Sequence, residues 1–298
     1  MERVLIAASV KNYLELLRVK QYVKNLFVFI PAFFAGQLML EGVFLKHVTG
    51  FVAFSLVASA IYILNDYLDV EKDRLHPTKQ YRPLASGVIG INSAFILFIS
   101  CLSAGLWIAY LMEGKFFLLL TGYLLMNFAY CFVLKKISLI DVSVIAFGFL
   151  FRVFSGGEIA DVIVSKWLVI MTFLLALLLG MAKRRDDVLI KVRSGQEMRK
   201  SIQGYNLDFL NIAMVLLAAV TIVSYIMYTI SPEVIERINN DYIYLTAFFV
   251  LMGILRYLQI AVVEEKSGSP TEVLLKDGFI QITLFGWFLT FAIILYVV

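Results

Sequence analysis

Cysteine, histidine and charged residues are scarce in this 298-residue chain. Its 2 cysteines and 2 histidines are too few for a disulfide framework or a multi-histidine metal centre. Charged residues make up 16% of the chain, against about 25% in soluble domains. The hydrophobic share is 61%, and mean hydropathy is +0.87. These values exclude a disordered chain and an ordinary soluble enzyme, and they predict an integral membrane protein.

Apolar runs long enough to cross a bilayer account for most of the sequence. A spanning helix needs about 20 mostly apolar residues, and in lipid only a helix satisfies the backbone of such a segment. We therefore predict an all-α membrane protein with nine transmembrane helices in a single domain over residues 1–298. The predicted spans are 26–44, 48–64, 93–112, 116–134, 139–155, 163–182, 208–230, 242–263 and 279–297. Residues 1–24 are predicted to form an amphipathic segment on the membrane surface, or else a solvated lead-in to the first span.

Lysine and arginine are distributed unevenly between the two ends of these spans. With nine spans, 20 of the 26 fall in the N-terminal segment and in loops that follow even-numbered spans, whereas 4 fall on the opposite side. The positive-inside rule then predicts a cytoplasmic N-terminus and an external C-terminus. We expect a multi-pass protein of the inner (plasma) membrane. Its long charged loops, 65–91 and 183–207, are predicted to be cytoplasmic active-site loops.

Three aspartates at the end of the second span mark a candidate metal site. Asp66, Asp69 and Asp73 follow an i, i+3, i+7 spacing, so a continuing helix would present them on one face. A divalent cation would relieve their mutual repulsion, and Mg²⁺ prefers a few carboxylates together with substrate phosphates. We predict that these three residues bind Mg²⁺ and are catalytic. The alternative is a solvated helix end neutralised by Lys72 and Arg74.

Polar side chains near the predicted cytoplasmic face are candidate ligands for substrate phosphates. Arginine and lysine donate charge-assisted hydrogen bonds to phosphate oxygens. The predicted substrate-binding residues are Gln21, Lys24, Asn25, Asn65, Lys79, Arg82, Asn127, Tyr130, Lys135, Lys183 and Arg184. Arg152 lies within the fifth span, and we expect it to pair with Glu158 or Asp161.

The first long loop carries an extended motif. It reads Asn65-Asp66-x-x-Asp69-x-x-x-Asp73-Arg74 and continues Pro77-x-Lys79-x-x-Arg82-Pro83-x-x-x-Gly87. This pattern resembles the UbiA superfamily of intramembrane prenyltransferases. The segments Arg18-Val-Lys-Gln21-Tyr-Val-Lys24-Asn25, His76-Pro77-Thr78-Lys79, Lys183-Arg184 and Pro270-Thr271-Glu272-Val273-Leu274-Leu275-Lys276-Asp277 resemble its bacterial decaprenyl-phosphate phosphoribosyltransferase branch.

The resemblance implies a nine-helix UbiA-like bundle and a Mg²⁺-dependent glycosyltransferase. Such an enzyme moves 5-phosphoribose from phosphoribosyl pyrophosphate to a polyprenyl (decaprenyl-type) phosphate and releases diphosphate. The expected partners are these two substrates and the membrane; no nucleic acid is expected, and a homo-oligomer is compatible with the sequence. In organisms that make cell-wall arabinan, the resemblance implies that the product would feed cell-wall biogenesis.

One departure separates this chain from prenyl-transferring relatives, in which a second motif, Asp-x-x-x-Asp, is expected after the sixth span. Here Asp186 and Asp187 are adjacent, so on a helix they point about 100° apart. The same stretch begins with Lys183, Arg184 and Arg185, which suits a donor that carries a second phosphate.

Two other functions remain as alternatives. A UbiA-type prenyltransferase would use a prenyl diphosphate and an aromatic or quinone-precursor acceptor. A transporter or channel would place ionisable residues through the bilayer, whereas here they gather at one face.

Overall fold

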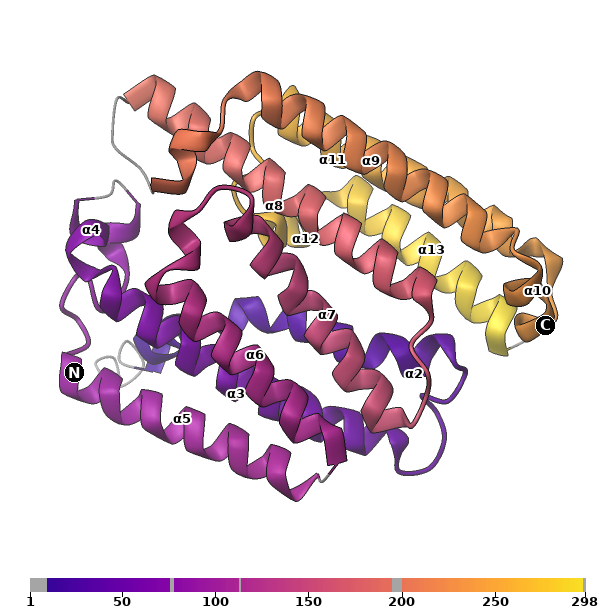
Figure 1. The fold of residues 1–298 in the computed structure, drawn as a ribbon, viewed down its shortest axis with the longest axis horizontal. Helices are drawn as coiled ribbons and strands as arrows, with labels where there is room; N and C mark the ends of the chain where they lie inside the picture. The colour runs from indigo at the N-terminus through magenta and orange to yellow at the C-terminus, as the bar shows by residue number, and fades with distance from the viewer. Residues whose placement is uncertain (1–9, 76–77, 113, 195–199, 297–298) are drawn as a thin grey trace. The chain divides into compact units, whose positions relative to one another are not determined.

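The computed structural model describes residues 10–75, 78–112, 114–194 and 200–296, and every regular element in these ranges is a helix (Figure 1). The predicted all-α class is therefore confirmed. The 3₁₀ helices are η1 (Val19–Phe29), η2 (Lys79–Tyr81), η3 (Leu134–Lys136), η4 (Lys200–Gly204) and η5 (Asp241–Leu245). The α-helices are α2 (Ile30–Phe34), α3 (Val43–Leu68), α4 (Val70–Arg74), α5 (Ile91–Leu111), α6 (Gly114–Phe132), α7 (Ile140–Ala160), α8 (Lys166–Ser194), α9 (Leu207–Thr229), α10 (Pro232–Ile238), α11 (Thr246–Val262), α12 (Pro270–Lys276) and α13 (Gly278–Tyr296).

The chain forms two compact units. Unit 1 comprises Met1–Val133 and Phe151–Ile163, and unit 2 comprises Leu134–Leu150 and Val164–Val298. In unit 1, α3 lies alongside α5 and also contacts α6 and η1 (Figure 1). In unit 2, α8 lies alongside α9, and α11 contacts both α9 and α13.

Each unit has its own apolar core. The core of unit 1 is centred on α3, where Phe54 and Val57 are fully buried against residues of α6 such as Phe116 and Leu120. The core of unit 2 joins residues of α8, α9 and α11, among them Leu178 and Met214. Burial of this apolar surface positions the polar helix ends described below.

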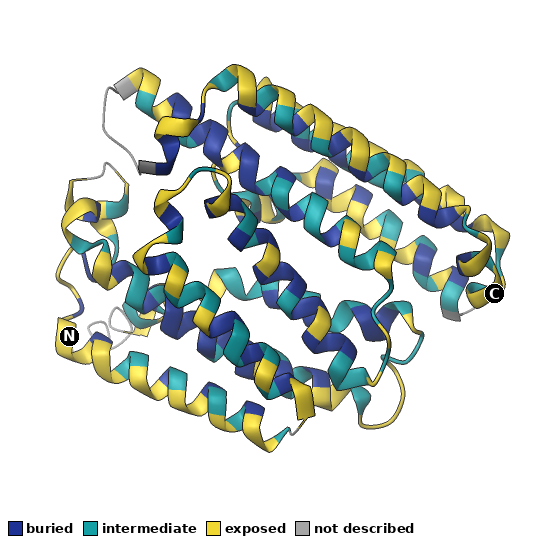
Figure 2. Ribbon diagram, in the orientation of Figure 1, coloured by how far each residue is buried: buried dark blue, intermediate teal, exposed yellow. Residues whose placement is uncertain are grey.

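Eight helices of the described residues are long and apolar enough to cross a membrane, and they coincide with the second to ninth predicted spans. Large apolar side chains are exposed along them, such as Phe95 and Trp107 on α5 and Val215 and Val223 on α9. Figure 2 shows many exposed positions along both helices. Apolar surface on this scale is stable in lipid rather than in water, so the chain is a multi-pass membrane protein.

The first predicted span, 26–44, does not form one long helix. Its residues belong to the end of η1, the short α2 and a series of turns that precedes α3. Gly36 and Gly42 have φ angles of 67° and 77°, a left-handed conformation that a continuous right-handed helix excludes. Nine spans and a cytoplasmic N-terminus therefore remain predictions, and residues 1–9 of the predicted amphipathic segment lie outside the described residues.

Candidate functional site

Asp66 and Asp73 lie on one helical path at the end of α3. The helix is interrupted only at Asp69, yet the Asp69 amide donates to the Asn65 carbonyl (3.0 Å) and the Asp73 amide donates to the Asp69 carbonyl (2.8 Å). Helical hydrogen bonding therefore continues into α4, and residues seven apart remain nearly aligned because two turns contain 7.2 residues. Both Asp66 and Asp73 are buried, which agrees with the shared helix face that the i, i+7 spacing predicts.

Arg82 joins the two carboxylates. Its Nη1 atom lies 3.0 Å from Asp66 Oδ1 and 2.6 Å from Asp73 Oδ2. Arg82 precedes Pro83 and has φ −61° and ψ 144°, the extended conformation that a following proline favours. This local geometry turns the chain after η2, so the predicted phosphate ligand Arg82 reaches back to α3.

A second arginine, Arg18, also binds this cluster. Its Nη2 atom donates to Asp66 Oδ1, and its guanidinium lies 4.8 Å from the centre of the Tyr62 ring. Arg18 was not among the predicted ligands. Its place in the segment that ends at Asn25 was the available signal, but only the fold shows that it meets α3.

Two buried carboxylates that share one cationic nitrogen are a fitting pair of hard oxygen ligands for Mg²⁺. The described residues contain no group of three His, Cys, Asp or Glu side chains close enough to hold a metal ion. Asp69 stands at the turn between α3 and α4 and is only half-buried. On a helix it points about 60° away from Asp66, whereas Asp73 points only about 20° away. The structure thus brings together Asp66 and Asp73, and a third ligand from Asp69 remains a prediction.

Helix η1 is held against α3 by hydrogen bonds at a three-residue spacing, one turn of a 3₁₀ helix. The Tyr22 hydroxyl lies 2.8 Å from Ser59 Oγ, and Asn25 Nδ2 donates to Ser55 Oγ (2.8 Å). Asn25 Oδ1 accepts a hydrogen bond from Arg152 Nε (2.8 Å). Asn25 is only 1% exposed, and these hydrogen bonds fasten η1 to α3 and α7. Its predicted role as a substrate ligand remains a prediction.

Arg152 was expected to pair with Glu158 or Asp161, but the structure shows contacts with other residues. Besides Asn25, it donates to the Tyr123 hydroxyl (3.1 Å) and lies over the Phe54 ring at 5.1 Å. Glu158 lies 3.9 Å from Lys115. An arginine inside an apolar span must find its partners within the bundle, and here the described partners come from η1, α3 and α6.

Lys24 is the most isolated predicted ligand of unit 1. It is half-buried, and the described residues offer its ammonium neither a hydrogen bond nor an ion pair. The pKa of Lys24 is lowered to about 8, mainly by burial and in addition by the nearby Arg152 and Arg18 charges. A desolvated cation with like-charged neighbours is suited to an anionic ligand.

The other predicted ligands of unit 1 are half-buried: Gln21, Asn65, Lys79, Asn127 and Tyr130. Asn127 Nδ2 donates to the Tyr123 carbonyl (2.8 Å) of its own helix. His76 and Pro77 of the loop motif lie outside the described residues. Lys79 and Arg82, the two basic residues that follow in this motif, are described.

Arg184 lies in the interior of unit 2. Its Nε lies 2.7 Å from Asp141 Oδ2, and its Nη1 lies 2.6 Å from Asp187 Oδ2. The Tyr205 hydroxyl donates to Asp141 Oδ1 (2.8 Å). The Arg184 side chain is 1% exposed and joins two aspartates of unit 2, and its predicted contact with a substrate phosphate remains a prediction. Lys135 is also buried.

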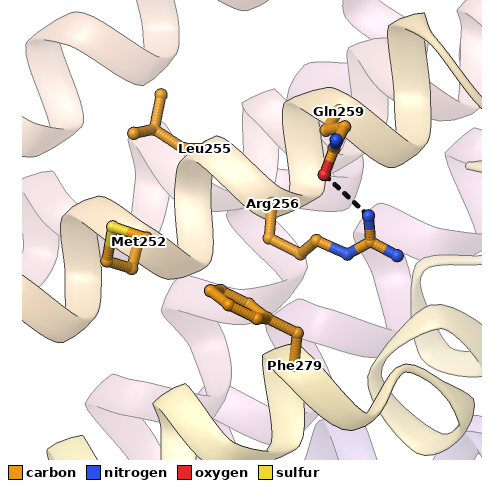
Figure 3. Close-up of a pocket in the computed structure, with 5 residues that line it drawn as sticks. All are labelled: Met252, Leu255, Arg256, Gln259 and Phe279. Carbon is orange, nitrogen blue, oxygen red and sulfur yellow. Dashed lines mark hydrogen bonds between the residues drawn. The ribbon is translucent and has the colours of Figure 1, made fainter.

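A pocket of about 400 Å³ lies in unit 2 (Figure 3). It is lined by Met252, Leu255, Arg256 and Gln259 of α11 and by Phe279 of α13. Arg256 Nη1 donates to Gln259 Oε1 (2.7 Å), and the guanidinium also pairs with Glu264 and Asp277. Since two carboxylates already neutralise this arginine, the pocket has no net positive charge for a phosphate.

The profile of the UbiA prenyltransferase family matches residues 26–267. The chain belongs to this family. Among curated proteins, the decaprenyl-phosphate phosphoribosyltransferase of Mycolicibacterium smegmatis is 30% identical over 297 residues, which cover 96% of this chain and 93% of that protein. The 4-hydroxybenzoate octaprenyltransferase of Pseudoalteromonas translucida is 25% identical over 223 residues, 72% of this chain and 76% of that protein.

A solved structure shares the fold. The UbiA homolog from Archaeoglobus fulgidus, bound to GPP and Mg²⁺, aligns with a TM-score of 0.71 at 21% identity and covers 94% of this chain and 99% of that one.

In the described part of unit 2, Asp186 and Asp187 do not form the second carboxylate pair expected of prenyl transfer. Asp186 Oδ1 accepts from Ser267 Oγ (2.9 Å), whereas Asp187 pairs with Arg184. The two neighbouring aspartates therefore point to different partners, as their adjacency predicts. Lys183, one position before Arg184, is exposed on α8.

Proposed function

We propose that this UbiA family protein transfers 5-phosphoribose from phosphoribosyl pyrophosphate to a polyprenyl phosphate and releases diphosphate. The observation that carries the proposal is similarity over nearly the whole chain to a decaprenyl-phosphate phosphoribosyltransferase, at 30% identity. A cytoplasmic site in the inner (plasma) membrane fits a water-soluble donor and a lipid acceptor.

Asp66 and Asp73 are the residues that would hold Mg²⁺, with Asp69 as the third candidate. When bound, the ion supplies positive charge that stabilises the leaving diphosphate. The two carboxylates already converge on a cation, the Arg82 guanidinium. This arrangement supports a site completed by substrate phosphates, the coordination that Mg²⁺ favours.

The basic residues of unit 1 would bind and orient the donor. Arg18 and Arg82 contact Asp66 at the end of α3, and Lys79 lies in the loop that follows. Each of the three can donate to phosphate oxygens. The acceptor phosphate is already largely ionised at neutral pH, so the reaction requires no strong base. Catalysis then depends on positioning the acceptor for in-line attack and on stabilising the leaving group.

The competing function is prenyl transfer to an aromatic acceptor. It is supported by the similarity to the 4-hydroxybenzoate octaprenyltransferase of Pseudoalteromonas. The arrangement of Asp186 and Asp187 argues against it, because their carboxylates bind Ser267 and Arg184 separately. A prenyl diphosphate held through metal ions by two aspartate motifs would find no second carboxylate pair here, within the described residues.

The two functions are separated by a donor assay on the purified, lipid-reconstituted full-length protein. With Mg²⁺ and decaprenyl phosphate, labelled phosphoribosyl pyrophosphate should yield a lipid-extractable product. Asp66→Asn should reduce turnover at least about a hundredfold, the scale of losing a major electrostatic stabiliser. Arg74→Gln, which removes an exposed arginine paired with Glu71, serves as the matched control. Prenylation of 4-hydroxybenzoate without any use of phosphoribosyl pyrophosphate would refute the proposal.

A further inference from the structure

We propose that Arg18 and Arg82 occupy the metal-binding carboxylates while the metal is absent and are transferred to the donor's diphosphate when the metal binds. The inference rests on the proposed function for its donor. It makes Arg18 a substrate-binding residue and the two arginines an exchangeable lid over Asp66 and Asp73.

The contacts of Asp66 Oδ1 are the first support. This single oxygen accepts from Arg18 Nη2 and from Arg82 Nη1. Arg82 Nη1 also donates to Asp73 Oδ2. A metal ion that used these carboxylate oxygens would therefore compete directly with both guanidiniums.

Exposure shows which of these groups are accessible to solvent. The Arg18 and Arg82 side chains are each 24% exposed, whereas those of Asp66 and Asp73 are only 3% and 7% exposed. The carboxylates thus lie beneath the arginines, and a ligand that arrives from solvent meets the guanidiniums first. By contrast Arg184, which joins two aspartates in unit 2, is 1% exposed and has no such freedom.

The charge balance explains why the exchange would need a phosphate. The four groups in contact, two carboxylates and two guanidiniums, have no net charge together, so a metal ion added alone leaves these four groups with an excess charge of +2. Like charges at hydrogen-bond distances repel strongly in a partly buried site. A diphosphate supplies the missing negative charge and accepts the hydrogen bonds that the arginines give up.

Arg18 is held in place independently of Asp66. Its backbone has φ 53° and ψ 46°, a left-handed conformation that few residues other than glycine adopt. Its guanidinium rests on the Tyr62 ring, one helical turn before Asp66. Stacking of this kind would keep the arginine beside the site after it releases the carboxylate.

Metal titration in the absence of phosphate tests the exchange. Mn²⁺ binding to the purified full-length protein is measured by electron paramagnetic resonance for the wild type, Arg18→Gln, Arg82→Gln and the control Arg74→Gln. Removing a competing guanidinium should tighten Mn²⁺ binding at least about tenfold in the first two variants, and Arg74→Gln should match the wild type. Mn²⁺ binding that is unchanged or weaker in both Arg18→Gln and Arg82→Gln overturns the proposal.

Two further measurements distinguish the exchange from a purely structural role of the arginines, and neither depends on which donor the enzyme uses. Mn²⁺ should raise the thermal unfolding midpoint more in Arg82→Gln than in the wild type, because the variant's uncompensated carboxylates gain a cation; an equal rise argues against the exchange. Labelled inorganic diphosphate, in the presence of saturating Mn²⁺, should bind at least about tenfold more weakly to Arg18→Gln and Arg82→Gln, and unchanged binding contradicts the transfer to phosphate. Inorganic diphosphate is common to both donor classes, so a failed phosphoribosyl assay would leave this result standing.

Discussion

Arg82 and Arg184 show how burial sets the role of one residue type. Each joins two aspartates, but the side chain of Arg82 is 24% exposed and that of Arg184 is 1% exposed. A buried ion pair that loses one member leaves an uncompensated charge, so Arg184 is tied to the fold. Arg82 can exchange partners at lower cost because water reaches it.

Lys24 allows the role of a single residue to be tested by the pH dependence of KM. Its pKa of about 8 results mainly from burial. If its ammonium holds a substrate phosphate, KM for that substrate should rise several-fold between about pH 7 and pH 9 as the charge is lost. Lys24→Arg keeps the charge and should flatten this dependence, whereas the exposed neighbour Lys20→Arg should not change it. A KM profile that is the same in Lys24→Arg and the wild type would exclude Lys24 as the group observed.

Raising the pH has opposite effects on the contribution of Lys24 to folding stability and on its proposed contribution to substrate binding. A lysine whose pKa falls on folding gives up its proton more readily in the folded state. Its contribution to stability therefore rises with pH between about 8 and the ordinary value of 10.5.

Elements differ in how far their local sequence determines them. Long apolar helices such as α5 and α9 occur where hydropathy predicts them. The first predicted span is replaced by η1 and α2, and the interactions of η1 with α3 and α7 depend on the tertiary structure. Gly156 is the point of closest approach, since a Cβ atom there would lie 1.9 Å from the Val28 carbonyl oxygen.

The substitution Gly156→Ala should therefore push η1 away from α7. Over-packing of this kind costs about 1–3 kcal/mol, and the thermal unfolding midpoint of the solubilised protein should fall accordingly. Gly90→Ala is the matched control, because nothing lies within 4 Å of its added Cβ and its φ is not positive. Equal midpoints for the two variants would mean that the contact between η1 and α7 is unimportant for stability.

At the scale of the whole molecule, exposed apolar helices require a bilayer, and basic residues predict its orientation. Reporter fusions at residues 80 and 190 should be cytosolic, and a fusion at the C-terminus should be external. The reason is the 20-to-4 bias of lysine and arginine under a nine-span count. A cytosolic C-terminal reporter would contradict this topology. An external N-terminal reporter would instead fit the eight long helices of the described residues, because loss of the first predicted span moves only the N-terminus to the other side.

The sequence by itself determined that this is a membrane protein, where its eight long helices lie, and that Asp66 and Asp73 share one helix face. These features depend on local quantities: hydropathy over about 20 residues and a spacing of seven on a helix. Such quantities are present in the chain before it folds.

Only the tertiary structure decided which residues surround those carboxylates. Arg18 meets Asp66 across 48 residues of chain, and Asn25 meets Arg152 across 127. Helix packing also buries Arg184 and Asn25, each only 1% exposed. A buried charge or amide must find a partner wherever the chain brings one, and that path is set by the packing of many helices rather than by any local pattern.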